Sequence, residues 1–334
     1  MASRSRVGSA RRTAALARLL VLLGGSAGAC ATPSDARVIA DTLGAEPANV
    51  RRVRVQARKE LVENSGLARS VAQPGIIFTI NDSGNEPLLF ALDTTGADRG
   101  VWRIRGARNT DWESVSVGPC GAPGRAGPNE CVYIGDTGDN DAARRDRTIY
   151  RVVEPKAEAA GFDGSLEAQP LVYRYADGAH DVEAMYVAPN GSVFLITKRQ
   201  LRGSNRERRP ALVFEVPASA WRSASTPVVA ALVDSLSIVP GSAPRRMITD
   251  AALSHDGRRL AVRTYTQIFV FATDSATGRV VRDVAPGVCN LAPLGRSQGE
   301  GVTWYGDRDR LIVSSEGRNS PMIAVDCPMP SRPR

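Results

Sequence analysis

The stretch Glu113-Ser114-Val115 decides the fold, because its pattern of a polar, a small and an apolar residue returns along the chain. Each copy continues into an apolar run and a turn such as Ala188-Pro189-Asn190-Gly191. A repeat of this kind indicates an array of similar units. The five copies are Ser65-Gly66-Leu67, Glu113-Ser114-Val115, Glu183-Ala184-Met185, Asp250-Ala251-Ala252 and Glu300-Gly301-Val302.

Short β-branched runs bounded by turns follow each copy, and they are typical of strands. The second runs are residues 76–80, 132–134, 193–196, 260–262 and 311–313. The third runs are residues 88–92, 149–152, 212–216, 268–271 and 322–325. A fourth, weaker set is residues 101–104, 171–175, 228–233 and 280–284. The last unit has no fourth run of its own, and residues 50–55 are expected to supply it.

Four strands in each of five radial units predict an all-β fold, a five-bladed β-propeller. The N-terminal strand closes the last blade, so no sheet edge is left free. A sixth, degenerate blade within residues 200–248 is the alternative. Outside the first 30 residues we find no helical period, so we expect few helices.

The first residues indicate export. The pattern is that of a signal peptide, with arginines up to Arg18, an apolar run at residues 19–23 and small residues up to Cys30. The apolar run is too short to cross a bilayer. We assign residues 1–29 to the signal, 30–48 to a flexible tether and 49–334 to one propeller domain. Ala27-Gly28-Ala29-Cys30 resembles a lipoprotein cleavage site, which predicts an envelope lipoprotein acylated at Cys30. The alternative is ordinary cleavage after Ala29, giving a secreted or periplasmic protein.

The remaining cysteines agree with an oxidising compartment. Cys120 and Cys131 flank a loop rich in glycine and proline between two expected strands, so they are expected to pair. Cys289 and Cys327 then form a second disulfide by elimination. Their spacing fits no zinc site.

The net charge of +8 does not indicate nucleic-acid binding. Five of the arginines lie before residue 30, where there are no acidic residues, so the remainder carries a net charge of +3 (8 − 5). A domain that is only mildly basic lacks the electrostatic footprint of a nucleic-acid-binding protein. The only expected membrane contact is the N-terminal lipid, and we expect a monomer.

Acidic residues recur where the innermost strands begin. In an antiparallel meander, this point and the connection between the second and third strands lie at the same end of the blade. The strand entries carry Glu113, Glu183, Asp250 and Glu300, with Ser65 in the first blade and Asp111 and Asp181 two positions before Glu113 and Glu183. The connections add Asp82 and Asp136, each in an Asp-Ser/Thr-Gly loop, with a weaker analogue at Ser315-Glu316-Gly317. Asp256, Asp307 and Asp309 belong to turns at the opposite end.

Carboxylates gathered at one narrow channel repel each other unless something neutralises them. Calcium is the simplest answer, because it accepts six to eight oxygen ligands in loose geometry. Protonation, water or arginine partners are alternatives. The predicted metal ligands are Glu113, Glu183, Asp250, Glu300, Asp111, Asp181, Asp82 and Asp136.

Four motifs together resemble secreted bacterial propellers, both the SdiA-regulated type and the phytase-like, esterase-like type, which are often labelled WD40-like or NHL-like. The resemblance covers nearly the whole chain after the signal. It implies a calcium-supporting channel lined here by Glu113, Glu183, Asp250 and Glu300, although those relatives usually have six blades. The motifs are Asn81-Asp82-Ser83-Gly84-Asn85, Asp111-Trp112-Glu113-Ser114, residues 133–140 and Asp181-Val182-Glu183-Ala184.

Two functions follow from these features. The first is an envelope-tethered calcium-binding propeller that binds a small molecule or a protein at its acidic channel end. The alternative is a calcium-dependent hydrolase of phosphate or carboxylic esters, in which basic residues hold the anion. No Gly-x-Ser-x-Gly motif supports a serine hydrolase. The candidate ligand-binding residues are His180, Lys198, Arg199 and Arg263.

Overall fold

The computed structural model describes most of the chain after residue 49. Contacts divide the chain into two units, Met1–Ala45 and Glu46–Arg334, and every described residue belongs to the second. The predicted signal, the tether and Cys30 lie outside the described residues, as do Arg199, Asp307 and Asp309. The described residues are 50–55, 58–121, 130–198, 210–222, 227–236, 238, 247–294, 299–306 and 310–330.

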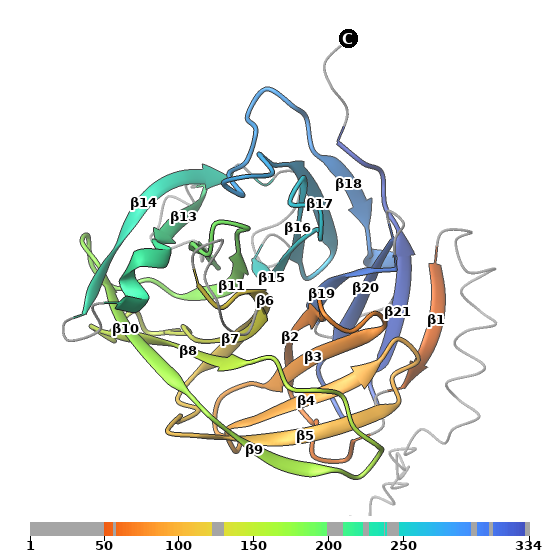
Figure 1. Cartoon of the computed structure of the whole chain (residues 1–334). Coiled ribbons are helices and arrows are strands. Elements are labelled where there is room, and N and C mark those ends of the chain that lie inside the picture. The colour runs from red at the N-terminus through yellow and green to blue at the C-terminus, as the bar shows by residue number, and fades with distance from the viewer. Residues whose placement is uncertain are drawn as a thin grey trace, which may run out of the picture. The chain divides into compact units, whose positions relative to one another are not determined.

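Inner strands form the centre of the described structure. Each one contacts the next in chain order, and the last contacts the first, so they close into a ring (Figure 1). Each contains one of the repeated tripeptides, and the prediction of an all-β propeller is confirmed. The inner strands among the described residues are β2 (Asn64–Arg69), β6 (Trp112–Pro119), β11 (Val182–Val187), β15 (Ile248–Leu253) and β19 (Gly299–Tyr305).

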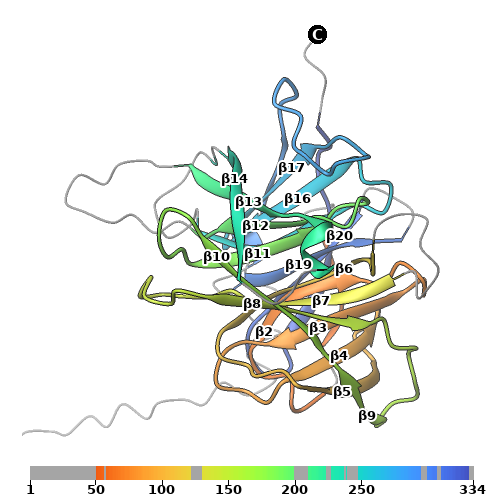
Figure 2. The same cartoon turned by 60° about the vertical axis from the view of Figure 1, so that its left-hand side comes forward.

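The first sheet runs outward from β2 and carries one strand that the sequence pattern did not predict. Its members in order are β2, β3 (Ile76–Asn81), β4 (Leu88–Asp93), β5 (Asp98–Arg105) and β9 (Asp163–Glu167). Strand β9 pairs in parallel with β5 along the outer edge of the sheet (Figure 2). Its residues alternate between exposed and half-buried, so no apolar run marks it in the sequence.

The next two meanders are joined into one sheet. The first consists of β6, β7 (Glu130–Asp136), β8 (Arg147–Val153) and β10 (Gln169–Tyr175). The second consists of β11, β12 (Val193–Thr197), β13 (Ala211–Val216) and β14 (Val228–Leu236). Their outer strands β10 and β14 pair in parallel, which protects both edges.

The following sheet corrects one predicted strand. It consists of β15, β16 (Arg259–Thr264), β17 (Gln267–Ala272) and β18 (Gly287–Asn290). The prediction that residues 280–284 form the fourth strand is wrong, because β18 pairs with β17 instead. Val280 makes only an isolated bridge to Thr273 within a hairpin turn.

The last sheet is closed by the N-terminal strand, as predicted. It consists of β19, β20 (Arg310–Ser315), β21 (Pro321–Asp326) and β1 (Val50–Val55). Strand β1 pairs antiparallel with β21, so the N-terminal and C-terminal strands of the domain are hydrogen-bonded to each other (Figure 1). Helices are few, as expected, and those in the described residues are the short 3-10 helices η1 (Ala218–Arg222) and η3 (Ala292–Leu294). No helix in the described part is long and apolar enough to cross a membrane.

Apolar side chains fill the space between neighbouring sheets. Phe78 and Ile80 of β3, for example, share one buried cluster with Trp112 and Val115 of β6 and with Ile134 of β7. Burying a large apolar side chain contributes about 1.5–3 kcal/mol. The core therefore lies between the blades, and this packing fixes where each inner strand begins.

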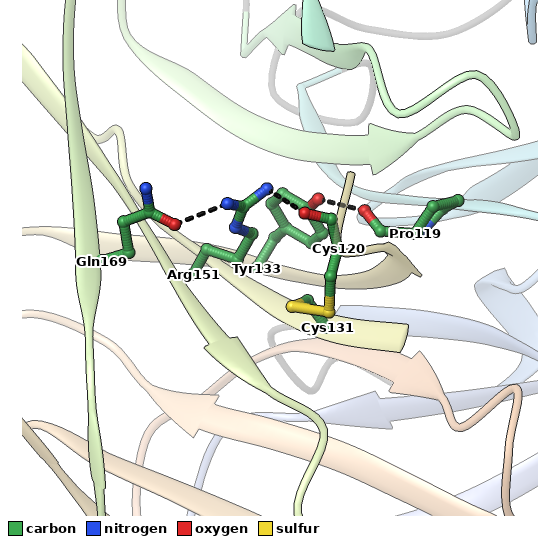
Figure 3. The surroundings of a disulfide bond; sticks show 6 residues. All are labelled: Pro119, Cys120, Cys131, Tyr133, Arg151 and Gln169. Atoms are coloured by element: carbon green, nitrogen blue, oxygen red, sulfur yellow. Dashed lines mark hydrogen bonds between the residues drawn. A yellow bond between two sulfur atoms is a disulfide. The ribbon is translucent and has the colours of Figure 1, made fainter. Parts of the chain in front are cut away.

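Both predicted disulfides are present, Cys120–Cys131 and Cys289–Cys327. Figure 3 shows the first, where Arg151 donates a hydrogen bond to the carbonyl oxygen of Cys120 and another to Gln169. The second links β18 to the residue after β21, so it joins two successive sheets. Two disulfides are typical of a protein that works outside the reducing cytoplasm.

Candidate functional site

Irregular pairing at the start of the inner strands aims acidic side chains away from the regular ladder. In β6, the register shifts between Trp112 and Ser114 and leaves Glu113 without a paired residue on β7. In β11, the shift between Val182 and Ala184 does the same for Glu183. A bulge re-aims the side chain of its extra residue. Both glutamates are buried, with 4% and 3% of their surface exposed.

Three carboxylates meet at this end of the propeller. Asp82 follows β3, Asp111 precedes β6, and Glu113 lies in the bulge of β6. One carboxylate oxygen from each lies within 4.8 Å of the other two. We call these three residues the carboxylate cluster.

Gly138 leaves room for this cluster. A Cβ atom at this position would lie 2.5 Å from Asp111 Oδ2 and 2.7 Å from Glu113 Oε1. The backbone N–H groups of Thr137 and Gly138 both donate to the carbonyl oxygen of Asp111, at 3.1 Å. The glycine of the Asp-Thr-Gly loop is therefore required where the backbone approaches two carboxylates closely.

Asp136 has a different place from the one predicted. Its Oδ1 atom accepts a hydrogen bond from the backbone N–H of Asp111 at 3.1 Å and pairs with Arg144 Nη2 at 2.7 Å. Asp136 thus positions Asp111 and is already neutralised by an arginine, whereas the sequence placed it among the metal ligands.

Lys198 is the cation at the centre of the acidic end. Its Nζ atom lies 2.5 Å from Glu183 Oε1. Burial raises the pKa of Glu183 to about 8 even though the neighbouring ammonium of Lys198 lowers it. Asp181 Oδ1 accepts the N–H of Asp139 at 2.9 Å, while Asp181 Oδ2 is buried without a hydrogen-bond partner.

Asp250 lies in the interior and binds backbone. Its carboxylate accepts hydrogen bonds from the N–H groups of Leu67 at 3.1 Å, Val302 at 2.7 Å and Ala251 at 2.8 Å. These contacts join β15 to β19 and β2. All of its surface is buried, and its oxygens are occupied, which differs from the predicted role as a metal ligand.

Arg263 is also an interior residue. It donates to the carbonyl oxygens of Gly301 and Ser314, the second at 2.5 Å, and burial lowers its pKa to about 10. Glu300 is buried close by, and burial followed by repulsion from Glu183 raises its pKa well above the usual value. The predicted ligand-binding role of Arg263 therefore has no support in its contacts.

His180 lies outside the carboxylate cluster. Its Nε2 atom is 2.9 Å from Asp177 Oδ1, and its ring packs against Tyr175 and Phe214 at centroid distances of 4.9 and 5.0 Å. These contacts are those of a structural histidine.

The acidic end includes two residues that were not among the predicted site residues. Glu316 repels Asp82, and burial together with this repulsion raises the pKa of Glu316. Tyr265 is half-buried next to Glu300 and Lys198, and burial raises its pKa. Both follow a second strand of a meander, so the repeat itself carried the signal that would have placed them here.

Burial of Asp111 and repulsion within the cluster predict that the stability of the protein depends on pH. Burial, followed by repulsion from Asp82, raises the pKa of Asp111 to about 6. The unfolded values are about 3.9 for Asp and 4.3 for Glu. Between about pH 4 and pH 6 the native state therefore holds a proton on Asp111 that the unfolded state has lost, so stability falls as pH rises through this range.

We expect the melting temperature in EDTA to be about 2 °C lower at pH 8 than at pH 5 from this effect. The measurement is thermal unfolding across this range, and Asp111→Asn is expected to flatten the dependence. A melting temperature that rises steadily from pH 5 to pH 8 in EDTA would contradict the prediction.

No protein-family model and no curated protein matches the sequence. Among solved structures, the chain is similar to a glutaminyl cyclase of Myxococcus xanthus, with 12% identity, a TM-score of 0.44 and coverage of 84% of this chain and 97% of that one. It is also similar to the gluconolactonase XC5397 of Xanthomonas campestris, with 12% identity, a TM-score of 0.37 and coverage of 85% and 95%.

A third similar structure is the β-propeller domain of Cps50 (Swd1) from Myceliophteria thermophila. It has 13% identity and a TM-score of 0.35, and the match covers 78% of this chain and 83% of that one. One propeller fold supports many unrelated functions. Similarities this remote carry no argument about the site.

Proposed function

We propose that this protein is an exported calcium-binding propeller that uses the carboxylate cluster at its acidic channel end to bind a ligand. The observation that carries the proposal is the approach of Asp82, Asp111 and Glu113 to within 4.8 Å of one another. Oxygen ligands lie about 2.3–2.6 Å from calcium, so two ligands of one ion are at most about 5 Å apart. The three carboxylates satisfy this condition.

The charges around the cluster also favour a bound cation. Arg144 is paired with Asp136, and Lys198 is paired with Glu183. Neither cation is hydrogen-bonded to the cluster in the described residues. The pKa of Glu113 is raised well above its usual value, first by burial and then by Glu183 and Asp82. A divalent cation would favour the ionised form of all three carboxylates.

Calcium would bind through Asp82, Asp111 and Glu113, with Asp181 close enough to the cluster to repel Asp111. The unpartnered Oδ2 atom of Asp181 agrees with a cation nearby. Three carboxylates leave coordination positions for other oxygens. A small molecule or a protein that offers a carboxylate, phosphate or hydroxyl oxygen would complete them.

Calcium titration of the EDTA-treated protein tests the proposal. Calcium is expected to raise the melting temperature, and Asp82→Asn, Asp111→Asn and Glu113→Gln are each expected to weaken calcium binding at least tenfold. Isothermal titration calorimetry measures the affinity. The matched control is Glu86→Gln, which removes an exposed carboxylate from the same connection as Asp82.

The control variant should bind calcium like the wild type. A wild-type protein that gives no heat and no stabilisation with calcium would overturn the proposal. Equal affinities for the wild type and all three cluster variants would also overturn it.

The contacts favour binding over the alternative of a calcium-dependent ester hydrolase. A hydrolase of anionic esters needs a cation that can hold the substrate, yet Lys198 pairs with Glu183 and Arg263 donates to backbone carbonyls. Arg199 lies outside the described residues. We therefore expect that the calcium-loaded protein does not hydrolyse p-nitrophenyl phosphate.

We further propose that the whole domain has five blades. Five inner strands among the described residues already contact each other in a closed ring. The described parts of residues 200–248 belong to β13, η1, β14 and the start of β15, which are parts of blades already counted. Export through the signal peptide and tethering by a lipid on Cys30 remain part of the proposal.

A further inference from the structure

A cavity lies at the end of the channel away from the carboxylate cluster. It has a volume of about 210 Å³ and is lined by the later residues of all five inner strands. Each of these strands carries its acidic or polar entry residue near its start and its cavity residue further along. The walls are mainly apolar and include Leu67, Val115, Val187, Ala252 and Trp304.

Two neighbouring glutamates beside this cavity each have one carboxylate oxygen without a hydrogen-bond partner within the described structure. Glu130, at the start of β7, lines the cavity, and its Oε2 atom is buried without a hydrogen-bond partner. Glu154 is adjacent, because its backbone N–H donates to the carbonyl oxygen of Glu130 at 3.1 Å. The Oε1 atom of Glu154 accepts from Ser70 and Gln73, whereas its Oε2 atom is also buried and unpartnered.

The glutamates beside this cavity have no ion-pair partner in the part of the chain that the structure describes. Among the described residues, neither Glu130 nor Glu154 forms an ion pair. Arg69 also lines the cavity, and its guanidinium donates to the carbonyl oxygen of Gly306 at 3.0 Å. Burial and the neighbouring Glu154 raise the pKa of Glu130, as expected for a carboxylate that lacks a counter-charge.

These features select a class of ligand. A buried polar atom without a hydrogen bond costs about 1–3 kcal/mol, so a donor is expected at the carboxylate of Glu130, which lines the cavity. Apolar walls favour an organic body, and the missing counter-charge favours a cationic donor. A cavity of about 150 Å³ takes up benzene, so this cavity has room for an aromatic ring with a short substituent.

We propose that this end of the channel binds a small organic cation, a primary amine on an apolar body, whose ammonium group donates to Glu130. Glu130 directly precedes Cys131 in the sequence, and the Cys120–Cys131 disulfide, which Figure 3 shows, joins the start of β7 to the residue after β6. The rim is therefore a fixed part of the fold. This site is separate from the calcium site and does not depend on it.

Benzylamine is the test probe, with benzyl alcohol and benzoate as its uncharged and anionic counterparts. The indole of Trp304 lines the cavity, so its fluorescence reports occupancy. We expect saturable binding of benzylamine to the EDTA-treated full chain and at least tenfold weaker binding of the other two. Glu130→Gln is expected to weaken benzylamine binding at least tenfold, and Trp304→Phe is expected to remove the signal.

Glu86→Gln is the matched control, because it removes an exposed carboxylate at the acidic end, to which an amine is also attracted. It should leave the affinity for benzylamine unchanged. Weakening by Glu86→Gln but not by Glu130→Gln would overturn the proposal, as would equal binding of amine and alcohol or no saturable binding. Displacement of benzylamine by calcium alone would assign the rim to a metal ion instead.

Discussion

Replacing Asp250 by alanine is expected to lower the free energy of unfolding by about 5 kcal/mol or more. The substitution leaves three buried N–H groups, those of Leu67, Val302 and Ala251, without an acceptor, and each costs about 1–3 kcal/mol. The buried guanidinium of Arg263 interacts with two carboxylates, those of Glu300 and Asp250, and the substitution removes the second of them. Three inner strands lose their common anchor together.

Urea unfolding followed by circular dichroism measures this loss. Asp250→Asn keeps one acceptor oxygen, so we expect it to lose less stability than Asp250→Ala. Asp274→Ala is the control, because Asp274 lies in an exposed turn, where its carboxylate accepts hydrogen bonds only within residues 274–277. If Asp250→Ala cost no more than Asp274→Ala, the interior role assigned to Asp250 would be wrong.

The sequence could not predict that the bulge in β15 lies one residue before its acidic residue, whereas the bulges in β6 and β11 lie at theirs. Glu113 and Glu183 are the extra residues of their bulges, whereas the shift in β15 falls at Thr249 and leaves Asp250 paired opposite Arg263. Successive side chains in a strand point to opposite faces, so an offset of one residue sends equivalent acids in different directions. The tripeptide repeat looks the same in both cases.

Most of the architecture was predictable, because it depends on apolar runs that recur. Closure by residues 50–55 followed from a missing run in the last unit, and the structure pairs β1 with β21. Strand β9 was not predicted, because parallel pairing at an outer edge leaves its side chains exposed or half-buried. Strand β18 was not predicted, because it is only four residues long and half of these residues are exposed.

The candidate site was predictable as a region and less so as a set of contacts. The repeat predicted that acids gather at one channel end, and the structure brings Asp82, Asp111 and Glu113 together. Which acids are already neutralised depends on long-range partners such as Arg144 and Lys198. Their side-chain directions are set by packing between blades.

Replacing Asp139 by alanine is expected to lower the free energy of unfolding by about 4–5 kcal/mol. Arg147 is fully buried and pairs with Asp139, which has only 4% of its surface exposed. Asp139 also accepts hydrogen bonds from the N–H groups of Ala143 and Arg144, at 3.0 and 3.1 Å. Its removal leaves a buried guanidinium without its carboxylate.

The same substitution is expected to weaken calcium binding, because it loosens the loop that holds the cluster. Gly138 precedes Asp139 and donates to the carbonyl oxygen of Asp111, and the N–H of Asp139 donates to Asp181. Urea unfolding and calcium titration of one preparation measure both effects. Asp141→Ala, an exposed position two residues away, is the control and should change neither.

Asp139→Asn separates the charge from the loop contacts. It keeps an oxygen that can accept the N–H of Ala143 or Arg144 but lacks the charge that neutralises Arg147. We expect most of the stability loss to persist in this variant, because an unpaired buried charge is the larger cost. If Asp139→Asn unfolded like the wild type, hydrogen bonding within the loop, and not the ion pair, would be what holds this side of the site in place.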